Sequence, residues 1–117
     1  MLKRMCTAKI ANCYVTKSMQ HYEGSCGIDD SVLKASGIRP YEMVLIANVT
    51  NGRRFETYTI PEPKGSGAFC LYGGAAHMGA PGDELIIMAY GYLNEAEIAQ
   101  FKSPRVVRLG EKNKLKA

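Results

Sequence analysis

Turn-forming residues divide this chain into short segments, and the Asn51-Gly52 pair is the clearest of these divisions. Type I′ hairpin turns need a positive φ at both central residues, and Asn-Gly meets that need better than most pairs. The segment before it, Met43 to Val49, is apolar, and we expect a strand buried on both faces. The segment after it, Arg53 to Ile60, alternates in polarity and is expected to return as the partner strand.

The rest of the chain shows the same texture of short strands broken by glycine, proline and asparagine. Residues 10–15, 69–72, 84–92 and 105–109 have the composition of strands. A short helix is predicted between the Asp29-Asp30-Ser31 cap and Gly37, and another from Glu95 to about Phe101 behind an Asn94 cap. Because no repeat or linker interrupts residues 1–117, we expect one mainly β domain whose strands close into a barrel.

The composition excludes several classes of protein. With 46% hydrophobic and 22% charged residues, the chain is neither disordered nor fibrous. Its longest apolar run, Leu85 to Ala89, is far below the roughly 18 residues of a membrane span, so no membrane partner is expected. The N-terminal residues lack the apolar stretch of a signal peptide, which favours a cytoplasmic location.

The net charge of +4 is concentrated at the C-terminal end. Residues 102–117, which we term the basic tail, hold six basic residues and one acidic residue. Nucleic-acid binding usually leaves a basic face on the folded body, whereas a charged terminal segment is more often a solvated end. We therefore expect no nucleic-acid partner, and a small DNA-binding barrel that uses this tail is the weakest alternative.

The cysteines and histidines show no metal-binding pattern. The four cysteines, Cys6, Cys13, Cys26 and Cys70, include no Cys-x-x-Cys pair, and neither histidine stands at zinc-finger spacing from them. We expect no metal site, and free thiols in or near the core.

The segment His21-Tyr22-Glu23-Gly24-Ser25-Cys26 is the stretch that points to chemistry. A lone serine after glycine is usually a turn residue, but here it has company at fixed spacing. The accompanying residues are, in order, Lys9, Ile28-Asp29, Ala35-Ser36-Gly37-Ile38, Asn48-Val49-Thr50-Asn51-Gly52, Arg54-Phe55-Glu56-Thr57-Tyr58, Gly73, Ala75-Ala76 and Gly82-Asp83. Over roughly residues 1–101 this ordered set resembles the pyruvoyl-dependent aspartate 1-decarboxylase family.

The resemblance implies that the chain cleaves itself between Gly24 and Ser25, giving a β chain of residues 1–24 and an α chain of residues 25–117. The Ser25 hydroxyl would attack the Gly24 carbonyl and turn the amide into an ester. β-Elimination and hydrolysis would then leave a pyruvoyl group on the new N-terminus. Glycine before the serine allows the strained turn that this attack needs. A threonine of the family contacts the glycine carbonyl, and Thr57 matches it.

The same resemblance assigns roles in decarboxylation. The pyruvoyl group would form a Schiff base with the substrate amine and accept electrons as carbon dioxide leaves. Ser25, as the source of that group, and Tyr58, which matches the family's general acid, are the expected catalytic residues. A substrate with two carboxylates needs cationic donors, and a loop of small residues lets backbone groups approach it. The expected substrate-binding residues are Lys9, Arg54, Thr57, Gly73, Gly74 and Ala75.

The chain departs from the family pattern at four positions near the expected site. Ala11 and Asn12 stand where the family usually has His-Arg, Tyr72 stands where it has asparagine, and Gly74 stands where it has alanine. The processing residues are intact. These departures leave open a homologue with an altered amino-acid substrate, and also an uncleaved, non-enzymatic barrel with a structural or regulatory role.

The family's other properties complete the expectation. The implied fold is a six-stranded double-psi β-barrel with short flanking helices, assembled as a homotetramer with active sites at subunit boundaries. The implied product is β-alanine for pantothenate. No pyridoxal phosphate is expected, because the pyruvoyl group replaces it, and a maturation factor is a possible partner.

Overall fold

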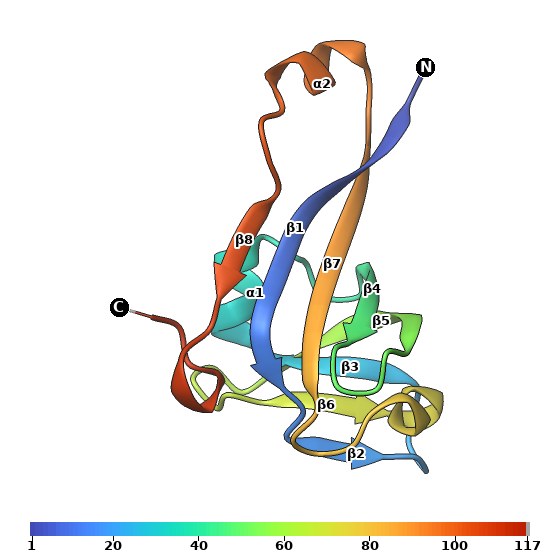
Figure 1. Ribbon diagram of the computed structural model, residues 1–117, viewed down its shortest axis with the longest axis vertical. Helices are drawn as coiled ribbons and strands as arrows, with labels where there is room; N and C mark the ends of the chain where they lie inside the picture. The colour runs from blue at the N-terminus through green and yellow to red at the C-terminus, as the bar shows by residue number, and fades with distance from the viewer. Residues whose placement is uncertain (117) are drawn as a thin grey trace.

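A computed structural model describes residues 1–116 of the chain, and it is mainly β (Figure 1). The strands are β1 (Lys3–Tyr14), β2 (Lys17–Met19), β3 (Ser25–Asp29), β4 (Met43–Asn48), β5 (Arg54–Glu62), β6 (Phe69–Tyr72), β7 (Glu84–Leu93) and β8 (Arg105–Arg108). The helical elements are α1 (Asp30–Ser36), α2 (Glu95–Gln100) and the short 3₁₀ turns η1 (Gly73–Met78) and η2 (Glu111–Asn113). The mainly β class predicted from the sequence is confirmed.

All eight strands belong to one sheet with the order β2-β6-β3-β5-β4-β7-β1-β8. Most neighbours are antiparallel, while β1–β8, β2–β6 and β3–β5 are parallel pairs. The sheet coils around a core to which nearly every strand contributes, with Ile10, Ile28, Ile46, Phe69 and Ile87 fully buried. This coiled body carries the candidate site.

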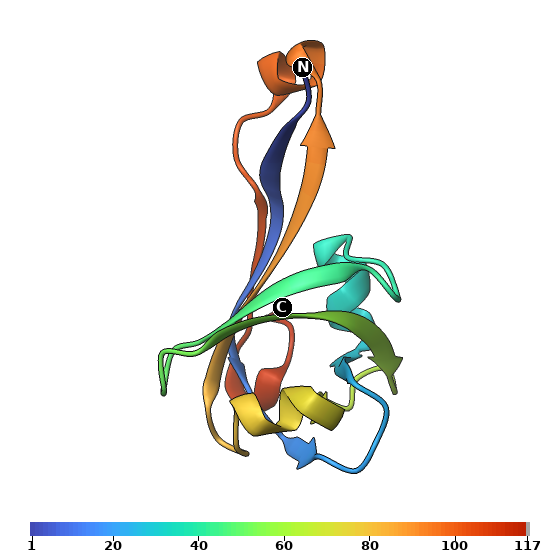
Figure 2. The ribbon, with the colours of Figure 1, turned by 90° about the vertical axis from the view of Figure 1, so that its right-hand side faces the viewer.

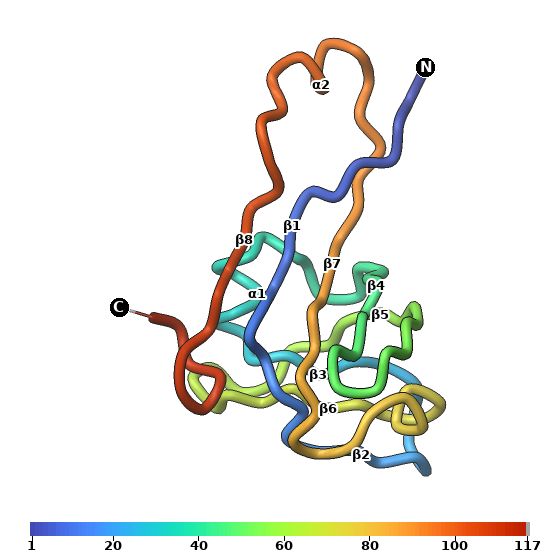
Figure 3. Tube along the Cα trace, in the orientation of Figure 1, coloured from blue at the N-terminus to red at the C-terminus, as the bar shows by residue number. Residues whose placement is uncertain are grey.

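The long strands β1 and β7 extend beyond the body as an arm. Figures 1 and 2 show this antiparallel ribbon rising to the N-terminus and α2, and the trace in Figure 3 brings the first residues beside the end of β7. The molecule is correspondingly elongated, at 43 × 32 × 24 Å. Exposed apolar side chains, among them Leu2 and Tyr92, cover part of the arm.

The hairpin predicted at Asn51-Gly52 forms and joins β4 to β5, but the predicted turn type is wrong. Only Gly52 has a positive φ, 79°. The loop is longer than two residues, and its backbone closes through a hydrogen bond from Gly52 N to Asn48 O. The Asn51 side chain instead accepts from Arg53 N and donates to Met78 O, which ties the turn to η1.

Strand β4 is buried on one face rather than on both as predicted. Val44 and Ile46 point into the core, whereas Met43 and Val49, just past the end of the strand, are more than half exposed. The apolar run therefore offers an uncovered surface beside the candidate site.

Both predicted helices are present with the predicted caps. The Asp29 side chain accepts from Ser31 N at the start of α1, and Gly37 ends that helix at φ 77°. In α2, Asn94 and Glu97 form a reciprocal capping box, which satisfies two backbone N–H groups that the helix itself leaves unpaired.

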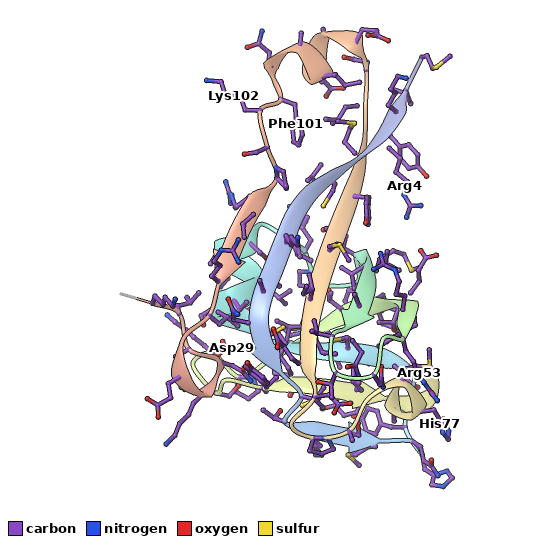
Figure 4. All side chains as sticks on the ribbon, in the orientation of Figure 1. Arg4, Asp29, Arg53, His77, Phe101 and Lys102 are labelled. Atoms are coloured by element: carbon purple, nitrogen blue, oxygen red, sulfur yellow. The ribbon has the colours of Figure 1, made fainter. Side chains whose placement is uncertain are left out.

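Asp29 also ties a loop to the body. Besides Ser31, its carboxylate accepts hydrogen bonds from Gly65 N and Gly67 N at 3.0 and 2.8 Å, and the side chain is almost fully buried (Figure 4). Burial alone would raise the pKa of Asp29, but these hydrogen bonds outweigh it and hold the pKa below its usual 3.8.

We expect Asp29→Asn to destabilise the fold by about 1.5–3 kcal/mol at pH 7, because an amide replaces a charged acceptor. A lowered pKa in the folded state means that the carboxylate contributes stability above its unfolded pKa, near 3.8, and loses it as the pH falls through the folded value. Urea unfolding of the wild type and Asp29→Asn should be measured at pH 7 and pH 3, at one protein concentration. The difference between their free energies of unfolding should be smaller at pH 3. An equal difference at both pH values would contradict this assignment.

Residues 102–116 of the basic tail are part of the fold, although their charged side chains are exposed as predicted. Its β8 segment pairs with β1, and Asn113 is buried. The Asn113 side chain accepts from Tyr14 N and donates to Tyr14 O and Gly67 O. The expectation of a simple solvated end is therefore wrong for the backbone, because these contacts fix it to β1 and to the Asp29 loop.

Candidate functional site

Ser25 opens β3, a wholly buried strand between β5 and β6. Its Cα lies opposite Tyr72 of β6, so the two side chains share one face of the sheet. On the other side, β5 runs parallel and pairs Thr59 with Cys26, which sets Tyr58 beside Ser25. The sequence analysis did not predict β3, because its glycine and its polar ends hide the short alternation of Cys26 and Ile28.

A pocket of about 520 Å³ lies at the Gly24 side of the Gly24-Ser25 peptide bond. It is lined by Gly24, Met43, Phe55, Glu56, Thr57, Tyr58, Gly74, Ala75 and Met78. Of the predicted site residues, the fold therefore gathers Gly24, Thr57, Tyr58, Gly74 and Ala75 around one space. Ser25 itself is only 2% exposed, directly behind Gly24.

Gly73 holds the small-residue loop against the predicted cleavage point. Its φ is 66°, and a Cβ there would lie 2.7 Å from both Gly24 Cα and Tyr22 O. Gly74, the next residue, has open space around it. The loop thus approaches the Gly24-Ser25 bond more closely than any residue with a side chain allows.

Lys9 and Arg54 are not among the residues that line this pocket. Arg54 is exposed at the start of β5, opposite Ala47, and Lys9 lies on β1 opposite Met88 of β7. With β4 and β7 between β5 and β1, the two cations are separated by roughly 14 Å across the sheet. Within one chain, the predicted carboxylate-binding cations do not meet at the pocket.

The sequence analysis missed four wall residues of the pocket, Met43, Phe55, Glu56 and Met78, because their positions in strands or in η1 give no signal of function. Glu56 adds a carboxylate to the pocket, and Arg4 of the arm (labelled in Figure 4) lies 3.7 Å from it in an exposed ion pair. Met43 adds an apolar surface. Beside them, the ring of Tyr41 lies 6.1 Å from that of Tyr58, although Tyr41 has the unfavourable φ of 69°.

Tyr72 is absent from the pocket wall and belongs instead to a small, partly buried cluster. Its hydroxyl donates to Glu62 Oε2 at 2.8 Å, and its ring lies 4.7 Å from that of Tyr22. Gly27 provides the room for Glu62, since a Cβ at Gly27 would overlap that carboxylate. Burial, together with the neighbouring Cys70 and Glu62, raises the pKa of the Tyr72 hydroxyl, which therefore stays a hydrogen-bond donor.

Two of the other departures from the family pattern, Ala11 and Asn12, lie in β1. Asn12 has a φ of 61° at an irregularity of the β1–β7 register, and asparagine tolerates this conformation better than a long side chain does. Ala11 is buried, and its carbonyl accepts from Leu109 N.

The thiols are free, as predicted, and Cys13, Cys26 and Cys70 are buried. Burial raises the pKa of Cys13 to about 12, so its thiol stays protonated. Within residues 1–116 no group of three or more His, Cys, Asp or Glu side chains is gathered as a metal site would require. In the same range, none of the helices has the length and apolar character needed to span a membrane.

Comparison with known proteins gives matches over nearly the whole chain. The family model described as "Aspartate decarboxylase" matches residues 1–116. An aspartate 1-decarboxylase of Syntrophobacter fumaroxidans is 49% identical over 97% of this chain and 91% of its own length. Aspartate 1-decarboxylases of Leptospira biflexa and Ralstonia pickettii are 42% and 48% identical, over 99% and 100% of this chain and 98% and 97% of their own.

Proposed function

Since this chain belongs to the aspartate decarboxylase family, we propose that it is a self-processing enzyme that converts L-aspartate to β-alanine and carbon dioxide. Its cofactor is a pyruvoyl group made from Ser25. The observation that carries the proposal is the pocket at the Gly24-Ser25 bond, which gathers Thr57, Tyr58 and the loop of Gly74 and Ala75 around Gly24. The product serves pantothenate synthesis.

Processing uses groups that this pocket already brings together. The Ser25 oxygen adds to the Gly24 carbonyl, and the peptide bond gives way to an ester. Elimination then releases residues 1–24 with a new carboxylate, and hydrolysis of the remaining dehydroalanine releases ammonia and leaves the ketone. The tetrahedral oxygen at Gly24 needs a hydrogen-bond donor, and the Thr57 hydroxyl, on the pocket wall, is the donor that we propose for it.

The pocket also suits the chemistry that follows. A pyruvoyl ketone supplies an electrophile for an amine and an electron sink for the pair left by departing carbon dioxide. Because Gly73 approaches Gly24 closely, the position of the ketone at residue 25 is shielded on one side. Gly74 and Ala75 have small side chains or none, which allows backbone groups to reach a ligand in the pocket. Tyr58, beside Ser25 on the next strand, is the proton donor to the substrate carbon.

The two cations complete the site through assembly. Lys9 and Arg54 are absent from the pocket wall of their own chain, and exposed apolar side chains cover part of the arm. A two-stranded ribbon is only marginally stable without further packing. We propose that a homotetramer buries the arm and brings these cations to pockets at subunit boundaries.

We also propose that the sheet closes into a six-stranded double-psi barrel. Thr16 N, just after β1, donates to Phe69 O at the start of β6, which supports this closure. The six strands would be β1, β3, β4, β5, β6 and β7.

Intact mass under denaturing conditions tests the proposal most directly. We expect two fragments, residues 1–24 and 25–117, with the larger one trapped by hydrazine or borohydride. The processed protein should release carbon dioxide from L-aspartate. Turnover of another amino acid in preference to aspartate would assign an altered substrate. A chain that stays whole with no reactive carbonyl would contradict the enzyme assignment and leave the non-enzymatic barrel.

We expect Arg54→Gln to raise KM for L-aspartate about 10- to 100-fold, since one charge-assisted hydrogen bond to a carboxylate is lost. Chain cleavage should be unchanged, because Arg54 is exposed and is absent from the wall of the pocket. The neighbouring Arg53→Gln is the matched control. Arg53 donates to His77 O beside the hairpin (Figure 4) and should leave KM near the wild-type value. An unchanged KM in Arg54→Gln would remove Arg54 from the substrate site.

A further inference from the structure

The segment before the cleavage point has little to hold it in place. Residues 20–24 are exposed and form no regular element, although the Gly24 carbonyl must stay within reach of the Ser25 oxygen. On the backbone side, Gly73 packs against Gly24 and Tyr22 O. On the side-chain side, the ring of Tyr22 packs on the ring of Tyr72. Tyr72 ends β6 and Gly73 begins η1, so two consecutive residues hold the segment, one through its side chain and the other through its backbone.

Tyr72 is itself firmly held. Its backbone is paired with Ser25, its side chain is 6% exposed, and its hydroxyl is bound to Glu62. Glu62 in turn occupies the space that the missing side chain of Gly27 leaves free. A rigid ring therefore stands directly across from the serine, anchored at its backbone and at its far end.

We propose that Tyr72, anchored by Glu62, is a positioning residue for chain cleavage, acting through its ring on Tyr22. The stack holds Tyr22, two residues before Gly24, so that the Gly24 carbonyl remains over the Ser25 oxygen. After cleavage the same stack keeps the new C-terminal end of residues 1–24 seated at the pocket. Tyr72 touches none of the reacting atoms. The inference rests on the proposed self-processing function and adds to it.

The test is the rate at which precursor made by cell-free synthesis separates into its two fragments, followed by denaturing mass spectrometry. The variants are Tyr72→Leu, Tyr22→Leu and the double variant, with Tyr72→Phe as the conservative change. We expect each leucine variant to slow cleavage about three- to tenfold, as loss of one aromatic pair does. Tyr72→Phe, which keeps the ring, should lose less. The double variant should be no slower than the slower single one, because both changes remove the same contact.

Two variants distinguish a positioning role of the Tyr22–Tyr72 stack from a general effect on folding. Tyr22 is 56% exposed, so Tyr22→Leu should leave the thermal unfolding midpoint of the precursor unchanged while cleavage slows. Tyr14→Leu, at an exposed tyrosine on β1, is the matched control and should cleave at the wild-type rate. Wild-type rates in both leucine variants, or effects that multiply in the double variant, would overturn the inference and leave self-processing standing. A wild-type chain that never cleaves would overturn both.

Discussion

A chain with Ser25 replaced by alanine is expected to remain a single polypeptide and to release no carbon dioxide from aspartate. The hydroxyl is the only atom of that residue that can open the Gly24-Ser25 bond, and its loss removes the source of the ketone as well. Ser25 is buried in a paired strand, where alanine fits without disturbing the backbone, so the variant should fold. Denaturing mass spectrometry and carbon dioxide release measure the two losses.

An exposed serine provides the control for this experiment. Ser103→Ala, in the connection between α2 and β8, should cleave and decarboxylate as the unchanged chain does. If Ser25→Ala still yields fragments 1–24 and 25–117, the nucleophile lies elsewhere, and the whole sequence of processing steps proposed for the pocket would have to be abandoned.

Local signals in the sequence were sufficient for most of the elements. The Asn51-Gly52 turn, the Asp29 and Asn94 caps and the Gly37 stop all act within a few residues, and each occurs where predicted. Features set by distant partners escaped prediction. Strand β3 exists because β5 and β6 flank it, and the tail is held against β1 at Asn113, which binds Tyr14. The residue pattern of β3 does not indicate which strands flank it, and the residue pattern of the tail does not indicate that Asn113 binds Tyr14.

The same distinction, between what the sequence indicates directly and what depends on distant parts of the fold, applies to the candidate site. Gly24, Thr57, Tyr58, Gly74 and Ala75 came from a resemblance in sequence, and the fold gathers them at one pocket. The resemblance could not say where Lys9 and Arg54 would lie in a single chain, because that depends on strand order. It also left open whether Tyr72 fills the pocket. The hydrogen bond to Glu62, made possible by the glycine at position 27, draws the ring away from it.

Gly73→Ala is expected to abolish chain cleavage and to lower the free energy of unfolding by about 2–4 kcal/mol, from backbone strain and overpacking together. At a φ of 66° alanine is strained, and its methyl carbon would lie 2.7 Å from Gly24 Cα and Tyr22 O. Both of these are backbone atoms, which no side-chain rotation can move aside. Either the loop retreats from the pocket or the Gly24-Ser25 bond shifts, and each outcome separates the serine oxygen from the carbonyl that it must attack.

Variants at two other glycines distinguish the contribution of backbone strain from that of the contact with Gly24 and Tyr22. Gly82→Ala, at a φ of 93° with no atom near its would-be Cβ, carries backbone strain alone. Gly74→Ala adds a methyl group to the same loop in open space, without a positive φ. Both should cleave at nearly the wild-type rate, with a loss of stability only in Gly82→Ala. If Gly73→Ala also cleaves at that rate, contact between the loop and the scissile bond is not needed for processing. If Gly82→Ala fails equally, strain rather than contact explains the loss.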